Sequence, residues 1–135
     1  MFLFLDPIRM IQDIRSQGGF IGTWGGLLNI PQLIGGLFFV FYIEGLVILL
    51  TVILTLMIAG QIHKRAPFSR LIGICHLPWL ALLPWLIWRL SAIVHPTLLF
   101  AWLIYVAVTI AVSLVFDIFD IYRFFRGDKK FAWAE

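Results

Sequence analysis

Three long apolar runs limit what this chain can fold into more than any other feature. They cover residues 33–59, 71–90 and 97–116. Each is close to the roughly 20 residues that a helix needs to cross the hydrocarbon core of a bilayer. Hydrophobic residues make up 62% of the chain and charged residues only 13%, which is far from the composition of a soluble domain. The sequence therefore predicts an all-α integral membrane protein with three transmembrane helices.

The segments outside these runs are short, and they divide the chain into four parts. We expect an interfacial amphipathic helix at 1–17, a glycine-rich loop or re-entrant segment at 18–32, the three-helix bundle at 33–122 and a cytoplasmic basic tail at 123–135. Neither the polar stretch at 60–70 nor the tail is long enough to bury a core of its own. Charged residues near the N-terminus argue against a cleavable signal peptide.

The basic residues predict the orientation of the chain in the membrane. They follow the first apolar run, at His63, Lys64, Arg65 and Arg70, and the third run, at Arg123, Arg126, Lys129 and Lys130. Because basic loops stay in the cytoplasm, both segments are expected on the cytoplasmic face, most simply of a bacterial inner membrane. With three spans, the simplest topology places the N-terminus on the opposite face.

The N-terminal segment predicts a helix that lies along the membrane and does not cross it. Asp6 followed by Pro7 is typical of a helix start. Apolar residues of this segment fall on one side (Phe4, Ile8, Ile11 and Ile14) and polar residues on another (Asp6, Arg9, Asp13, Ser16 and Gln17). A helix with such a one-sided apolar face is typical of the membrane interface.

The segment 18–36 is rich in glycine and allows three interpretations. Gly18, Gly22 and Gly26 recur every four residues, a spacing that lets another helix approach closely if the segment is helical. The alternative is a loop whose glycines permit turns. A re-entrant segment broken at 29–32 is a further possibility, and it would return the N-terminal helix to the cytoplasmic side.

Two charged residues inside the apolar runs are candidates for an intramembrane ion pair. Glu44 lies about 24 Å from the cytoplasmic end of the first span, and Arg89 lies about 28 Å from that end of the second, at 1.5 Å per helical residue. Their similar depth lets them meet near the outer interface. Otherwise Arg89 extends to water or phosphate, and Glu44 is protonated or faces another subunit.

A polar cluster is expected at the cytoplasmic end of the bundle. Asp117, Asp120 and Arg123 follow at three-residue spacing and share one helical face. We expect them to neutralise the basic loop, forming a polar clasp with Lys64, Arg65 and Arg70. A proton or cation site, or a docking point for a partner, is the alternative.

The second run contains His76 between apolar residues and prolines at 78 and 84 that should bend the helix. Two facing histidines can hold haem, but His63 lies in a loop and His95 at the opposite end of the bundle, so an intrachain haem site is not expected. His76 alone could bind a pigment or a quinone carbonyl, although a lone histidine in a span more often bonds a neighbouring carbonyl. Any cofactor is therefore unknown.

No motif in the sequence specifies a reaction. With one cysteine, Cys75, an intrachain disulfide and a paired-cysteine metal site are excluded, and no metal site is expected. The net charge of +3 needs no nucleic acid to explain it, because anionic lipids attract basic residues beside spans.

We expect a non-enzymatic accessory, assembly or scaffolding subunit of a larger membrane complex, for example a respiratory or photosynthetic one. Its partners would be membrane lipids and either other subunits or copies of itself. One alternative is a homo-oligomeric channel or transporter whose path is lined by Glu44, Thr51 and Thr55. The other is a subunit that binds a quinone, haem or pigment through His76.

Overall fold

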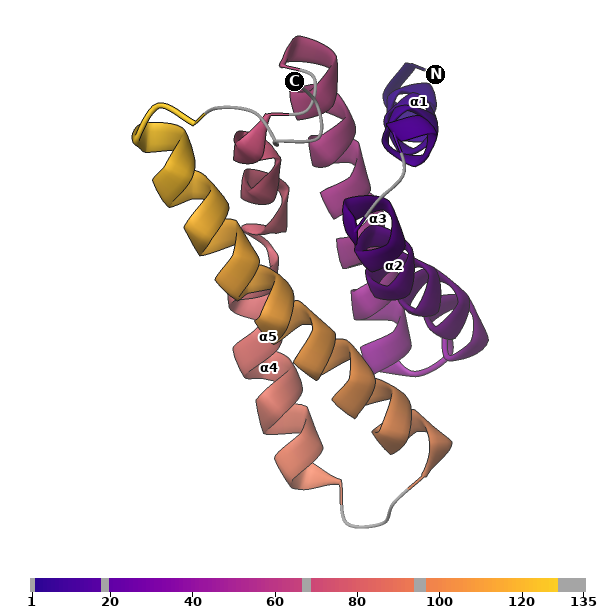
Figure 1. Cartoon of the computed structure of the whole chain (residues 1–135). Coiled ribbons are helices and arrows are strands. Elements are labelled where there is room, and N and C mark those ends of the chain that lie inside the picture. The colour runs from indigo at the N-terminus through magenta and orange to yellow at the C-terminus, as the bar shows by residue number, and fades with distance from the viewer. Residues whose placement is uncertain (1, 18–19, 67–68, 94–96, 129–135) are drawn as a thin grey trace.

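The computed structural model of the chain describes residues 2–17, 20–66, 69–93 and 97–128, and its regular elements there are all helices (Figure 1). They are α1 (Phe2–Gln17), α2 (Phe20–Phe38), α3 (Ile43–Arg65), the 3-10 helix η1 (Arg70–His76), α4 (Trp79–Ala92) and α5 (Leu98–Phe125). Helices α3 and α5 are long and apolar enough to cross a membrane, and η1 with α4 makes a third, bent candidate. The chain is thus an all-helical membrane protein with two or three candidate spans.

The ends of the two straight candidate spans follow from local chemistry. Helix α3 has Glu44 in its first turn and basic side chains in its last turn, the charge order that the helix dipole favours. Helix α5 begins after Thr97, whose side chain accepts a hydrogen bond from the backbone N–H of Phe100 at 3.2 Å, as an N-cap does. It ends at Phe125, nine residues beyond the apolar run, so the acidic residues after the run are helical.

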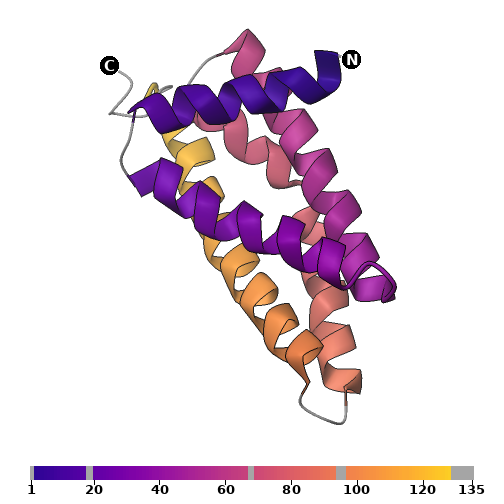
Figure 2. The ribbon, with the colours of Figure 1, turned by 90° about the vertical axis from the view of Figure 1, so that its right-hand side faces the viewer.

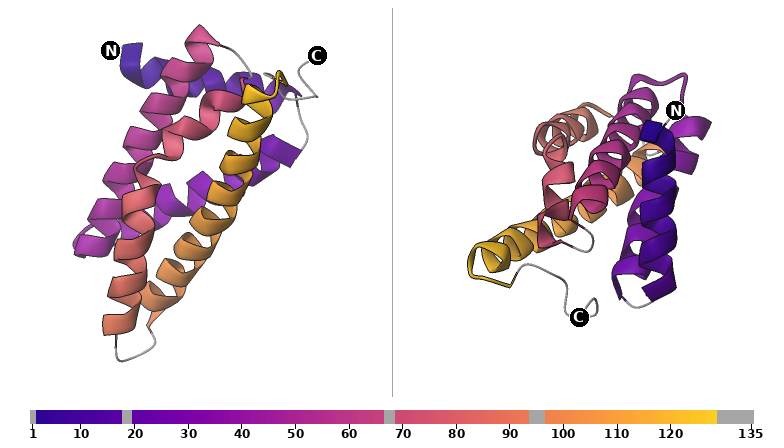
Figure 3. Two further views of the ribbon diagram at one scale, coloured as in Figure 1. Left: turned by 90° about the vertical axis from the view of Figure 1, so that its left-hand side faces the viewer. Right: turned by 90° about the horizontal axis from the view of Figure 1, so that it is seen from above.

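The third candidate span is bent by 45° between η1 and α4. Pro78 has no N–H to donate to the carbonyl of Ile74, and that carbonyl instead accepts the N–H of Leu77 at 3.1 Å. The α-helical pattern resumes after the proline, where Leu82 N–H donates to Pro78 O at 3.1 Å. Figure 3 shows η1 and α4 following one bent path between α3 and α5.

The glycine-rich segment is not a loop. Residues 20–38 form the continuous helix α2, which passes through the predicted break at 29–32. The chain turns at 39–42, and α3 begins at Ile43 rather than at residue 33. Both the loop interpretation and the predicted position of the break are therefore wrong. Helix α2 runs obliquely beside α3 (Figure 2).

Pro31 can lie inside α2 because another helix satisfies the carbonyl that it leaves unpaired. A proline at 31 cannot donate to Leu27 O. Tyr105 of α5 donates its hydroxyl to that oxygen at 2.6 Å. Trp102, one turn away, donates its indole N–H to Pro31 O at 3.1 Å. Side chains of α5 thus donate hydrogen bonds to backbone carbonyls of α2. In apolar surroundings such donors must come from the protein, because no water is present to supply them.

Helix α1 lies across the end of the molecule where α3 and α5 end (Figures 1 and 2). We call this the polar end. The backbone of α1 approaches Gly60 of α3 so closely that a Cβ there would lie 2.8 Å from the nitrogen of Pro7. The simplest predicted topology, with the N-terminus opposite the basic loop, is therefore wrong. The helix also begins at Phe2, so Asp6 and Pro7 are inside it and do not start it.

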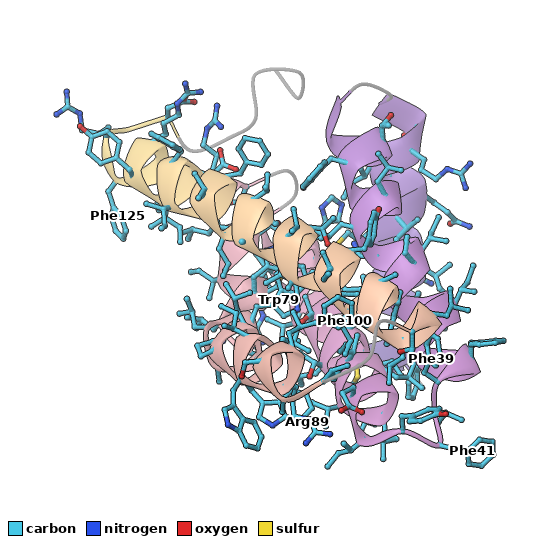
Figure 4. The ribbon with its side chains drawn as sticks, turned by 90° about the horizontal axis from the view of Figure 1, so that it is seen from below. Phe39, Phe41, Trp79, Arg89, Phe100 and Phe125 are labelled. Atoms are coloured by element: carbon cyan, nitrogen blue, oxygen red, sulfur yellow. The ribbon has the colours of Figure 1, made fainter. Side chains whose placement is uncertain are left out.

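Two groups of apolar side chains form the interior. The larger lies between α3, α4 and α5, around Trp79, Leu86 and Ile110, each 0% exposed. The smaller joins α1, α3 and η1 through Met10, Ala59 and Cys75. Seen from the end opposite α1, Trp79 lies inside the bundle and Phe41 points away from it (Figure 4).

Candidate functional site

Glu44 and Arg89 are in contact, as their similar depth suggested. The Nε of Arg89 donates to Oε1 of Glu44 at 2.8 Å, and Nη2 donates to the same oxygen. Glu44 is 4% exposed, whereas the guanidinium of Arg89 also lies near the rings of Trp85 and Trp88. Since Glu44 is held by a cation, it is not a free acid in this structure.

The predicted polar clasp forms around Arg70 alone. Arg70 is 5% exposed, and its Nη1 donates to Asp120 at 2.8 Å while Nη2 donates to Asp128 at 3.1 Å. Asp117 bonds His76 instead of a basic residue of the loop. The other predicted members, Lys64, Arg65 and Arg123, are exposed. Arg65 and Arg123 form no ion pair with another described residue.

Two acidic residues of α1 bind the last turns of α3, which the sequence did not indicate. Asp6 accepts hydrogen bonds from Gln61 at 2.8 Å and from Lys64 at 3.3 Å. Asp13 bonds Nε2 of His63 at 3.0 Å. Burial raises the pKa of the Asp6 carboxyl, but its two hydrogen bonds and the nearby positive charges outweigh burial, so that pKa lies below its ordinary value. These contacts attach α1 to α3.

His76 bonds a carboxylate and not the neighbouring carbonyl that we expected. Its Nδ1 lies 2.5 Å from Oδ2 of Asp117, and its ring stacks on Trp79 with centroids 3.9 Å apart. Gly73 makes the contact between η1 and α5 possible, since a Cβ there would lie 2.8 Å from Oδ1 of Asp117. The ring of His76 is therefore held at both its face and one nitrogen.

A cavity of about 750 Å³ lies between α1, α2, α3 and η1, and His76 is in its wall. Most of its lining is apolar, from residues such as Met10, Ile30 and Leu56. The polar lining residues are Arg15, Thr23, Asn29, Thr55 and His76. Thr55 lies ten residues before the end of α3, about 15 Å along the helix. The cavity thus reaches from α1 toward the middle of the candidate span.

Two polar atoms in this wall have no hydrogen-bond partner among the described residues. Thr55 is 1% exposed, and its Oγ1 has no partner. By contrast, Thr51 on the same helix donates to Val47 O at 2.7 Å. Asn29 donates its Nδ2 to Gly25 O at 2.9 Å, but its Oδ1 is unpartnered. A buried polar atom without a partner costs about 1–3 kcal/mol, so these positions need explanation.

The glycine stripe does not pack against another helix where the structure describes it. A Cβ on Gly26 would meet only Ile30, at 3.8 Å, and a Cβ on Gly25 would meet nothing within 4 Å. Both glycines line the cavity. Gly22 is in the first turn of α2, and Gly18 lies outside the described residues. The close approaches occur at other glycines: Gly35 against Trp102, Gly36 against Leu49 and Gly45 against Phe39.

The histidines and acids of the described residues do not gather into a metal centre. No group of three or more metal-ligating side chains occurs in this part of the chain. His63 and His76 each bond a different carboxylate, so neither presents itself as an axial haem ligand opposite the other. His95 lies outside the described residues.

Sequence reasoning missed the cavity, although its polar residues left a signal. Asn29 and Thr55 are polar positions in strongly apolar surroundings, which is unusual enough in membrane helices to mark a site. Their proximity depends on how α2 folds back on α3.

Comparisons of the chain with protein-family models, with curated proteins and with solved structures gave no match.

Proposed function

We propose that this chain is a non-catalytic membrane protein that holds a lipid-soluble molecule in the cavity between α1, α2, α3 and η1. The observation that carries the proposal is the hydroxyl of Thr55, which is buried without a partner in the wall of this cavity. A ligand that bonds the hydroxyl would remove the cost of burying it.

The dimensions and lining of the cavity support this role. Its volume of about 750 Å³ is within the range of about 300–1,000 Å³ that is typical of small-molecule sites. Such sites are mostly apolar and contain a few polar groups that orient the ligand. The cavity has the same character, with Asn29, Thr55 and His76 among apolar side chains.

The role of an accessory or assembly subunit in a larger complex is compatible with ligand binding. A small chain that holds a lipid or quinone can contribute it to a neighbouring subunit, and its partners would be membrane lipids and other subunits. Phe4 and Ile8 of α1 are exposed, which favours a position of α1 in the membrane interface. We place the protein in a bacterial inner membrane, with the polar end cytoplasmic.

The transport alternative has less support. It requires Glu44 as a free acid along a path with Thr51 and Thr55. Glu44 is bonded to Arg89, and Thr51 is bonded to its own helix. Of these three residues, only Thr55 has an unpartnered side-chain oxygen, and Thr55 lines the cavity.

The proposal is tested by filling the cavity. Gly26→Leu adds a side chain where the protein leaves space, and it replaces a helical glycine by a better helix former. Ile34→Phe enlarges an exposed side chain on the same helix and is the matched control. Wild type and control should retain a bound lipid-soluble molecule in native mass spectrometry from mild detergent, whereas Gly26→Leu should lose it without a lower Tm. Equal retention in all three proteins, or no bound molecule in any, would contradict the proposal.

The subunit role has its own test. A pull-down in mild detergent should recover stoichiometric unlike chains if the protein is an accessory subunit. Recovery of a homo-oligomer alone would favour the transport alternative.

A further inference from the structure

We infer that the ligand of this cavity is a lipid with a free hydroxyl group, such as a quinol or a long-chain alcohol, and that the unpartnered oxygens of Asn29 and Thr55 recognise that hydroxyl. This inference rests on the proposed function and names the chemical class of its ligand. It follows from the hydrogen-bonding capacity that the polar side chains of the cavity wall have left in the structure.

Asn29 requires a donor. Its amide N–H₂ already donates to Gly25 O at 2.9 Å, and its Oδ1 is buried without a partner. An amide oxygen can only accept a hydrogen bond. A quinone carbonyl, an ester or an ether cannot donate one, but a hydroxyl can.

Thr55 accepts either role. Its Oγ1 has no partner, and a threonine hydroxyl can both donate and accept. Threonines in helices commonly satisfy themselves by bonding the carbonyl four residues earlier, as Thr51 does. Thr55 does not make this bond, although its side chain is part of the cavity wall.

His76 is compatible with a hydroxyl in both of its protonation states. Nδ1 is engaged by Asp117, so a neutral ring carries its proton there and leaves Nε2 as an acceptor. If the ring is protonated, Nε2 donates instead. A hydroxyl can bond either form, although its single proton serves either Asn29 or the neutral ring, whereas a carbonyl can bond only the protonated ring.

Charge argues against an acidic lipid deep in the cavity. Arg15 is the one arginine or lysine in the described lining, and it belongs to the last turn of α1, at the polar end. The groups that line the cavity farther along α2 and α3, Asn29 and Thr55, are uncharged. A carboxylate placed beside them would be far from a compensating cation and costly to desolvate.

The test uses three photoreactive probes with the same C16 hydrocarbon chain: a diazirine-bearing alcohol, its methyl ether and the corresponding fatty acid. Each is added to the full-length protein in nanodiscs, and cross-linking to cavity peptides is measured against probe concentration. The alcohol should bind about tenfold more tightly than the ether, the effect of one hydrogen bond that is lost in a buried site.

Two matched variants locate the recognition. Thr55→Val removes an unpartnered hydroxyl at constant shape, so it should keep or raise the Tm and weaken the preference for the alcohol. Thr51→Val, one turn away, removes a hydroxyl that bonds only its own helix and should keep the preference. Equal binding of alcohol and ether would overturn the inference and leave the proposed function intact, as would equal effects of the two variants. Preferential binding of the fatty acid, lost in Arg15→Gln, would also overturn it. Failure of every probe to bind would contradict both.

Discussion

A hydrogen bond between two helices explains how a proline can lie inside α2. Pro31 removes one backbone hydrogen bond from α2, and Tyr105 of α5 donates to the carbonyl that this leaves free. Tyr105 is partly exposed on the outside of the bundle, but exposure there is exposure to lipid, which cannot donate a hydrogen bond. The tyrosine and the proline are therefore expected to depend on each other.

A double-mutant cycle tests this dependence. Tyr105→Phe should destabilise the protein by about 1–3 kcal/mol, because Leu27 O then lacks a donor. In a Pro31→Ala background the restored N–H supplies that donor, and Tyr105→Phe should cost much less. Thermal unfolding in detergent measures both values. The same loss in both backgrounds would mean that the tyrosine does not serve the free carbonyl.

The ion pair of Glu44 and Arg89 makes a second prediction at this scale. Glu44→Gln or Arg89→Met alone leaves one charge without its partner in a poorly solvated place, whereas the double variant leaves none. We expect a coupling of about 1–3 kcal/mol. Combining Glu44→Gln with Arg65→Met, at an exposed arginine of the same helix, gives the control, whose effects should add. If the stability losses of Glu44→Gln and Arg89→Met were additive, the two side chains would not interact. Glu44 would then again be a candidate ion site.

At the scale of elements, the attachment of α1 to α3 depends on charge. The pKa of Asp6 lies below its ordinary value, so the folded protein favours the ionised carboxyl. A group with a lowered pKa contributes stability above its unfolded pKa, and this contribution is lost as the pH falls through the folded pKa. The relevant window therefore begins near pH 4, because an unperturbed aspartate has a pKa of about 3.9, and it extends below.

We therefore predict that α1 loosens from α3 in acid. Hydrogen exchange of the α1 amides should accelerate as the pH falls below about 4, after correction for the intrinsic exchange rate. Asp6→Asn should give faster exchange already at neutral pH and remove this part of the pH dependence. An unchanged pH profile in Asp6→Asn would assign the attachment to apolar packing around Gly60 and Met10.

The helices differ in how well the local sequence predicts them. The apolar runs predicted α3 and α5, because hydropathy and length decide whether a helix can span a bilayer. Helix α2 was predicted only as one of several interpretations, because glycine, asparagine and proline lower its intrinsic helix preference. Its contacts with α3 and α5, including those of Trp102 and Tyr105, compensate for that weak preference.

At the scale of the whole molecule, the polar end gathers α1, the end of α3, the start of η1 and the end of α5. The sequence predicts that the 60–70 loop and the C-terminal tail lie on the same face of the membrane. The structure agrees with this prediction as far as residue 128. The tail beyond it, with Lys129 and Lys130, lies outside the described residues. The arrangement adds α1 to the same end.

Cysteine labelling tests this topology in a Cys75→Ser background. Arg9→Cys, Arg65→Cys and Arg126→Cys, all at exposed positions, should react with an impermeant maleimide only from the cytoplasmic side. Ser91→Cys, at the opposite end of α4, should react only from the other side. Labelling of Arg9→Cys together with Ser91→Cys would restore the three-span topology with an external N-terminus and contradict the arrangement described here.

What the sequence by itself determined is the class of the protein and the depth of its charged groups. Hydropathy is a property of each segment alone, so it identified a helical membrane protein without reference to any contact. Helical rise is constant, so counting residues was enough to bring Glu44 and Arg89 to a similar depth. Neither inference needs the direction in which a helix faces.

Only the tertiary structure decided which side of each helix meets which neighbour. The turn at 39–42 folds α2 back along α3 and returns α1 to the polar end, so that Asp6 and Asp13 replace Asp117 as partners of the α3 terminus. It also turns Asn29 and Gly26 toward a cavity instead of another helix. These outcomes depend on the rotation and tilt of the helices, which no single segment specifies, and packing between distant segments selects one arrangement.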